Sequence, residues 1–209
     1  MTEAGFHRIF VALFLAFVGL RFYWHGKARV WRKENSADEG KMILFLRVFV
    51  ALPLFAVLTW YLFDPRVLAW ADIPLRQWMR WTGVGLAVAS TGLAAWVHRE
   101  LGLNFSPQLR IRDHHQLVTS GPYRYVRHPM YTAFILLFVG YLLLTGNLFI
   151  SGMGLVTLVL VMIFRTHKEE RMMLERFGEE YRAYMDRTGR YVPRMAGARR
   201  SSVVATKSI

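Results

Sequence analysis

A basic, aromatic loop runs directly into an apolar helix at residues 121–131, and it carries side chains suited to chemistry. Pro129 fits the first turn of a helix, because its missing N–H costs nothing there and its φ angle is already set. The helix is therefore expected to begin near His128. Its positive dipole end, together with Arg127 and His128, predicts a site that favours a carboxylate or a phosphate. Basic residues in this position also commonly mark only the cytoplasmic edge of a membrane helix.

A second charged segment, residues 165–170, is predicted to meet the first. Two apolar runs, 129–144 and 148–164, are joined by only three residues, so they must form a tight antiparallel hairpin. Each arm is about 24 Å long at 1.5 Å per residue, and the open ends therefore meet. Arg165 and Glu169 are four residues apart and share a helix face, whereas Glu170 is expected to point elsewhere.

Arg165 and Glu169 have two interpretations. They could form a simple interfacial ion pair, which contributes only a few tenths of a kcal/mol. Alternatively, they belong to a site where a long ordered loop, a helix start and an acidic pair converge. A ligand with both a carboxylate and an ammonium, such as the methionine part of S-adenosylmethionine, would find a partner there for each group.

The composition indicates an integral membrane protein. The 209 residues are 54% hydrophobic, yet they include 27 Lys+Arg against 14 Asp+Glu, so apolar and charged residues must be segregated. The basic residues lie between long apolar runs, which argues against nucleic acid and favours anionic lipid as the partner. Cysteine is absent and His114 and His115 are adjacent, so no metal site is expected.

The apolar runs predict an all-α, polytopic membrane protein with about five transmembrane helices and a cytoplasmic C-terminal helix. A kink is expected at Pro53, and the third run is rich in small residues that allow close helix packing. After the fifth run, aromatic and Met residues at helical spacing predict that the helix continues into water until about Thr188. The expected spans are residues 6–24, 43–63, 81–97, 129–144 and 148–164.

Charge asymmetry predicts the orientation of these spans. One side of the membrane would carry 22 Lys+Arg and the other only four, so the active site and the C-terminus are expected to be cytoplasmic. The chain is expected to divide into three regions: three N-terminal helices (1–97), a region with the loop, the hairpin and the C-terminal helix (98–195), and a basic disordered tail (196–209). The oligomeric state is left open.

The motifs of residues 104–193 resemble those of the isoprenylcysteine carboxyl methyltransferases. The resemblance lies in His115-Gln116-Leu117-Val118-Thr119-Ser120-Gly121, Tyr123, Arg127-His128-Pro129-Met130-Tyr131, Glu169-Glu170 and Phe177-Gly178-Glu179-Glu180-Tyr181. Phospholipid N-methyltransferases and some small-thiol methyltransferases carry a similar signature. The resemblance implies S-adenosyl-L-methionine as the cofactor and a lipid or lipidated small molecule as the acceptor.

The resemblance also implies roles for individual residues. Arg165, Glu169 and Glu170 would be catalytic, and Arg165 would also contact the acceptor. The cofactor would be held by Gln108, His115, Gln116, Leu117, Val118, Tyr123, His128, Pro129, Met130, Tyr131 and Glu169.

The acceptor decides which side chains the reaction requires. A carboxylate is already a nucleophile and requires only orientation, for which the fork of donors on Arg165 is suited. An amine would also require a base, and Glu170 is the candidate. An isoprenylcysteine carboxyl O-methyltransferase-like enzyme is therefore expected, with phospholipid N-methylation or thiol S-methylation as alternatives. A non-enzymatic membrane scaffold or lipid-binding protein is the alternative from another class.

Overall fold

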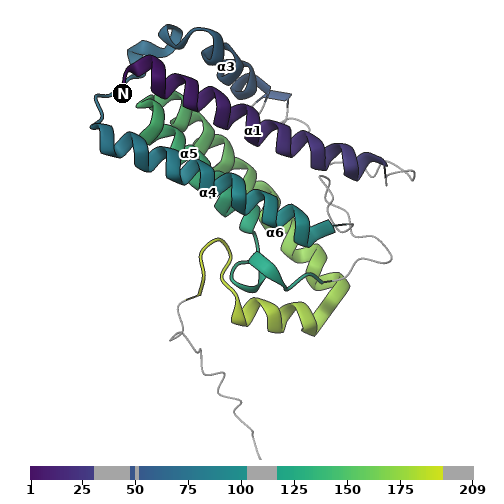
Figure 1. Ribbon diagram of the computed structural model, residues 1–209. Helices are drawn as coiled ribbons and strands as arrows, with labels where there is room; N and C mark the ends of the chain where they lie inside the picture. Colours follow the sequence, from purple (N-terminus) through teal and green to yellow (C-terminus); the bar gives the residue numbers. More distant parts are fainter. Residues whose placement is uncertain (31–47, 50–51, 103–116, 195–209) are drawn as a thin grey trace, which may run out of the picture.

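The computed structural model describes residues 1–30, 48–49, 52–102 and 117–194, which form helices joined by short segments (Figure 1). The predicted all-α class is confirmed for these residues. In chain order the elements are α1 (Glu3–Val30), α3 (Leu52–Phe63), η2 (Pro65–Ala71), α4 (Gln77–Leu101), η4 (Gly121–Arg124), α5 (Pro129–Thr145) and α6 (Leu148–Arg187).

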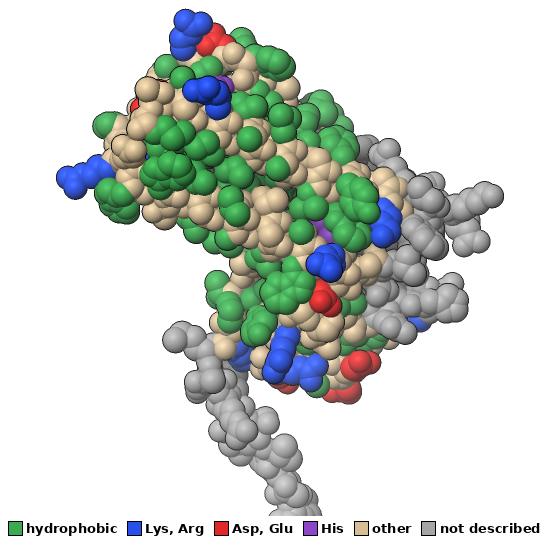
Figure 2. All heavy atoms as spheres, viewed as in Figure 1, with side chains coloured by type: hydrophobic (Ala, Val, Ile, Leu, Met, Phe, Trp, Pro, Cys, Tyr) green, Lys and Arg blue, Asp and Glu red, His purple; other side chains and the backbone are tan. Residues whose placement is uncertain are grey.

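Helices α1, α4 and α5 and the first part of α6 form a bundle, and α3 covers one end of it. The bundle encloses an apolar core in which Phe10, Tyr141 and Leu144 are almost completely buried. Figure 2 shows hydrophobic side chains spread over the sides of the bundle, while charged side chains gather at one end and around the C-terminal part. This distribution suits a bundle surrounded by lipid.

Small residues bring α4 and α5 into close backbone contact, as the sequence predicted. A Cβ atom on Gly83 would lie 2.4 Å from the Leu144 backbone nitrogen, and one on Gly140 would lie 2.9 Å from the Ala87 nitrogen. The fully buried Ser90 hydroxyl donates a hydrogen bond to the Ala133 carbonyl at 2.7 Å. The two helices therefore form a rigid pair that fixes where α5 begins.

The two-residue turn between α5 and α6, Gly146-Asn147, is held at both helix ends. Gly146 adopts φ 73°, in the left-handed region that favours glycine, and its N–H donates to the Leu142 carbonyl. Asn147 caps α6 by accepting a hydrogen bond from the Ile150 N–H at 3.0 Å. The predicted tight hairpin is therefore confirmed.

Helix α6 continues past Phe164 to Arg187, as predicted, but it breaks at Gly178. Gly178 has φ 51° and ψ −123°, a conformation that side chains with a Cβ rarely adopt. The last part of the helix turns beneath the 117–128 segment (Figure 1). The sequence analysis did not predict this bend, because the aromatic spacing remains helical across it.

By length and composition, two of the described helical stretches can cross a membrane, namely Glu3–Lys27 and Leu148–Arg187. A third is possible if α3 and η2, which meet at a bend of 112°, count as one span. Helix α5 is apolar but shorter, with 17 residues. Of the earlier expectations, the first part of the second span and the C-terminal tail lie outside the described residues.

Candidate active site

The start of α5 is tied to the end of α6 by backbone hydrogen bonds. The Arg127 N–H donates to the Gly189 carbonyl at 2.9 Å, and the His128 N–H donates to the Arg190 carbonyl at 3.0 Å. His128 is the residue before the first helical turn, as predicted. Because the Tyr131 and Thr132 N–H groups both donate to the His128 carbonyl, most donors at this helix start are already occupied. The helix start therefore offers a ligand fewer free N–H groups than the sequence analysis assumed.

Glu170 is the centre of a buried network of charges. Arg127 Nε donates to its Oε1 at 3.0 Å, and Arg190 Nη2 donates to its Oε2 at 2.5 Å. His128 Nε2 lies 3.3 Å from Oε1, and the Glu170 side chain is only 6% exposed. Burial opposes ionisation of Glu170, but hydrogen bonds from His128, Arg190 and Arg127 outweigh it and lower its pKa to about 2. These three basic side chains therefore hold Glu170 in place as an ionised carboxylate.

Arg127 joins this network to the C-terminal end of α6. Its Nη1 donates to the carbonyls of Met185 and Thr188, at 3.1 Å and 2.6 Å. Through Nε and Nη1, Arg127 therefore binds the chain's own carboxylate and carbonyls. The anion that the sequence analysis expected beside Arg127 is Glu170.

Glu169 is the more accessible of the two acids. Its side chain is 24% exposed, its Oε1 accepts a hydrogen bond from Arg165 Nε at 2.5 Å, and its Oε2 lies 3.6 Å from His128 Nδ1. His128 therefore lies between the two glutamates, one at each ring nitrogen. The expectation that Glu170 points elsewhere is wrong, because adjacent residues on α6 reach the two edges of one imidazole ring.

Aromatic rings surround this cluster. The Tyr131 and Tyr191 rings lie 5.7 Å and 5.8 Å from the His128 ring, measured between centroids. The Tyr191 hydroxyl donates to the buried Thr166 hydroxyl at 2.9 Å, and Thr132 donates to the Tyr191 carbonyl at 2.6 Å. These bonds fix the segment after α6 against both helices of the hairpin.

Tyr123 lies in η4, in the segment that leads into α5. Burial raises the pKa of the Tyr123 hydroxyl, and the nearby Tyr184 and the charge of Glu169 raise it further. The Tyr184 hydroxyl donates to the Tyr123 carbonyl at 2.7 Å, so the bent end of α6 supports the η4 segment. The structure thus brings Tyr123, His128, Tyr131 and Glu169 together, although up to 46 residues separate them.

The remaining predicted cofactor residues are placed only in part. Leu117 and Val118 are half-buried in the segment that leads into η4, Pro129 is buried, and Met130 is half-buried at the start of α5. Gln108, His115 and Gln116 lie outside the described residues.

Two residues of the network were missed by the sequence analysis. Neither Arg190 nor Tyr191 was singled out as a site residue, although both lie just after the predicted helix end near Thr188. Both follow the Gly178 bend, which brings them back to the hairpin. Helical periodicity cannot reveal such a return, although an Arg-Tyr pair directly after a helix stop was a visible signal.

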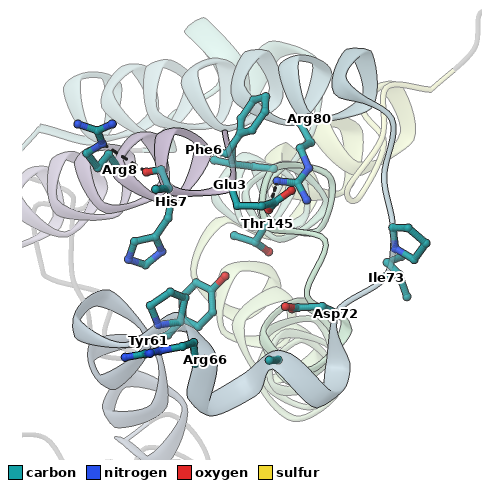
Figure 3. Close-up of a pocket in the computed structure, with 15 residues that line it drawn as sticks. Glu3, Phe6, His7, Arg8, Tyr61, Arg66, Asp72, Ile73, Arg80 and Thr145 are labelled. Atoms are coloured by element: carbon teal, nitrogen blue, oxygen red, sulfur yellow. Dashed lines mark hydrogen bonds and ion pairs between the residues drawn. The ribbon is translucent and has the colours of Figure 1, made fainter. Parts of the chain in front are cut away.

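A hollow of about 620 Å³, shown in Figure 3, lies at the end of the bundle away from the His128 cluster. Thr145 of the hairpin turn lines it, so the length of α5 separates it from His128. Its charged lining includes a 2.6 Å ion pair between Glu3 and the buried Arg80. The motif residues of the sequence analysis are absent from this lining.

Comparison with known proteins relates the chain to two kinds of methyltransferase. The phospholipid methyltransferase family profile matches residues 78–180, which cover α4, α5 and most of α6. The protein-S-isoprenylcysteine O-methyltransferases of Mus musculus and Homo sapiens are each 28% identical over 146 residues, 69% of this chain. The protein of that name from Schizosaccharomyces pombe is 40% identical over 81 residues, 38% of this chain and 34% of its own length. The chain spans about half the length of the mammalian relatives, 52% and 51% respectively.

A solved structure gives the fold. The eukaryotic intramembrane Ras methyltransferase, an isoprenylcysteine carboxyl methyltransferase, superposes with a TM-score of 0.53 and 22% identity, over 87% of this chain and 66% of that one. In sequence and fold the chain is thus similar to the phospholipid methyltransferases and the isoprenylcysteine carboxyl methyltransferases. The region that the family profile matches does not include α1 or α3. The network around His128 and Glu170 lies on elements that the match covers in large part.

Proposed function

We propose that the chain is an S-adenosylmethionine-dependent membrane methyltransferase that esterifies the carboxylate of a lipophilic acceptor, like an isoprenylcysteine carboxyl methyltransferase. The observation that carries this proposal is the contact of His128 with Glu169, beside the Arg165–Glu169 pair. These side chains offer one partly exposed carboxylate and one partly exposed guanidinium, 24% and 21% exposed, beside an aromatic wall.

The partly exposed groups fit the cofactor. The Glu169 carboxylate suits an ammonium group, and the aromatic rings of Tyr123 and Tyr131 suit contact with a sulfonium or an adenine ring. When bound, S-adenosylmethionine supplies an electrophilic methyl group. His128 would fix the position of Glu169, since Glu170 holds the opposite nitrogen of the same ring.

The state of Glu170 favours a carboxylate acceptor over an amine. A base for amine methylation must accept a proton, but Glu170 has a pKa of about 2 and is held by three basic side chains. A carboxylate acceptor requires no base. Arg165 could orient it, and exclusion of water from the site would favour the transfer. Phospholipid N-methylation remains the second candidate, because the matching profile is named for that activity.

The division of the chain and its orientation belong to the same proposal. Residues 98–195 would form the catalytic core, and residues 1–97 would shape the acceptor site. Helices α1, α4, α5 and α6, with a second span ending in α3, would make five crossings. The excess of Lys+Arg near the His128 cluster supports a cytoplasmic cofactor site and C-terminus.

Methyl transfer from labelled S-adenosylmethionine tests the proposal directly. Purified protein in detergent would be given an S-prenylated N-acetylcysteine, phosphatidylethanolamine or a small aliphatic thiol in separate reactions. We expect label in the base-labile methyl ester of the first acceptor. Label in the phospholipid would favour the second candidate, and binding without transfer to any acceptor would overturn the proposed activity.

A further inference from the structure

Arg21 lies on α1, outside the region that the family profile matches, yet its guanidinium reaches the end of the bundle that carries the His128 cluster. Its Nη1 lies 3.1 Å from His98 Nε2 on α4 and 3.8 Å from the Met130 sulfur at the start of α5. The guanidinium also lies over the Phe134 ring, 5.5 Å from its centroid. Three helices therefore fix the position of this one charge.

His98 positions Arg21 without neutralising it. A guanidinium only donates hydrogen bonds, so His98 Nε2 must accept, and the imidazole is neutral with its proton on the other nitrogen. His98 is fully buried and stacks on Trp24, with 5.6 Å between ring centroids and 12° between ring planes. Among the described residues, no carboxylate is paired with Arg21.

The direction of Arg21 distinguishes it from an ordinary interfacial arginine. Arginines at the ends of membrane helices usually extend to the lipid headgroups, whereas this one turns inward to a buried histidine. Arg21 contacts Met130, two residues after His128, and His128 contacts Glu169, the partner of Arg165, so the two positive charges lie at the same end of the bundle and repel each other. An anion placed between Arg21 and Arg165 would remove that repulsion.

The surroundings indicate what kind of anion would fit. The Phe17 and Phe134 rings pack beside Arg21, with their centroids 5.6 Å apart, so the position is apolar on the side that faces α1 and α5. An acceptor with a carboxylate on an apolar chain would place its charge at the arginines and its chain along these rings. A free inorganic anion would gain nothing from the aromatic side.

We infer that Arg21 is an acceptor-recognition residue that holds the substrate carboxylate together with Arg165, and that His98 and Trp24 position it. This inference rests on the proposed function and adds the N-terminal helix to the acceptor site. Arg21 binds and orients the carboxylate, while the methyl transfer itself requires no proton from it.

The test compares a ligand that carries a carboxylate with its uncharged carboxamide analogue. Binding of an S-prenylated N-acetylcysteine and of its carboxamide would be measured on detergent-solubilised wild type and Arg21→Gln, with S-adenosylhomocysteine present. Arg21→Gln is expected to weaken carboxylate binding about 10- to 100-fold, because a charge-assisted contact is lost, and to leave carboxamide binding within about twofold. The KM for the carboxylate should rise while kcat changes little.

Matched variants separate recognition from folding. Arg8→Gln removes a positive charge from the other end of α1, where Arg8 is exposed and bonds to the Ala4 carbonyl, and should leave both affinities unchanged. Arg21→Lys keeps the positive charge but lacks the planar set of guanidinium donors, so its affinity for the carboxylate should lie between those of Arg21→Gln and the wild type. It serves as the test variant if Arg21→Gln does not fold, and it should then weaken carboxylate binding more than carboxamide binding.

Failure of the Arg21 proposal can be distinguished from failure of the proposed function. Equal weakening of both ligands, or no weakening of either, would overturn the role of Arg21 while leaving methyl transfer by the wild type intact. Absence of transfer by the wild type itself would instead overturn the proposed function. His98→Ala should reproduce the selective loss of carboxylate binding, since it removes the group that holds the guanidinium in place.

Discussion

At the scale of single residues, Arg165 and Glu169 form one ion pair but have separate proposed roles. Glu169→Gln is expected to weaken S-adenosylhomocysteine binding about tenfold, because an ionic hydrogen bond becomes a neutral one. Arg165→Ala should leave that affinity within about twofold and abolish methyl transfer, since Glu169 keeps its contact with His128. Calorimetric titration checks both, and equal losses of affinity would contradict separate roles.

Glu170 gives a prediction about pH. Its pKa is about 2 against an ordinary value of 4.5, so its contribution to stability is complete above about pH 4.5 and disappears as the pH falls towards 2. Glu170→Gln is expected to destabilise the protein by roughly 3 kcal/mol at pH 7, because three buried or half-buried basic side chains lose their shared negative partner. The deficit should shrink between pH 4.5 and pH 2. Thermal unfolding at several pH values measures it, with the exposed Glu180→Gln as the control.

At the scale of elements, the contact between α4 and α5 sets the position of His128. Gly83→Ala would place a Cβ 2.4 Å from the Leu144 backbone nitrogen, and backbone cannot yield as a flexible side chain can. We expect a loss of about 1 to 3 kcal/mol of stability and a fall in Tm. Gly85→Ala, on the same helix with open space around it, should have no effect or stabilise slightly. A fall of similar size in both variants would contradict the role of Gly83 in packing, because Gly85 has no neighbour that a Cβ would meet.

The bend in α6 depends on one residue. Gly178 has a positive φ and nothing within 4 Å of a Cβ at its position, so Gly178→Ala tests backbone conformation without a steric clash. We expect a cost of about 1 to 3 kcal/mol and weaker S-adenosylhomocysteine binding, because the bend returns Arg190 and Tyr191 to the site. Unchanged stability and affinity would mean that the bend does not support the site.

At the scale of the whole molecule, the proposed orientation places the His128 cluster and the C-terminus in the cytoplasm. Reporter fusions at the C-terminus, one active only inside the cytoplasm and one only outside it, check this. The cytoplasmic reporter is expected to be active. Activity of the other reporter alone would reverse the orientation and the proposed route of the cofactor.

The sequence alone predicted the features that depend on local order. A proline after His128 predicted the start of α5, a three-residue connection predicted the hairpin, and small residues predicted the close approach of α4 and α5. Arms of equal length then brought His128 to Glu169, since helical rise is fixed. Several of the motifs that resemble those of the methyltransferases, including residues 127–131 and 169–170, lie on these locally determined elements.

Only the tertiary structure decided which charges neutralise each other. Glu169 and Glu170 are adjacent in sequence, and both were candidates for catalysis. The structure shows that Glu170 is paired with Arg127, His128 and Arg190. Arg190 returns to the site through the bend at Gly178, which helical periodicity does not reveal. Arg21 meets His98 across 77 residues, a contact that no motif encodes. Burial and ion pairing are properties of the packed chain, so the division between structural and ligand-facing charges could be seen only there.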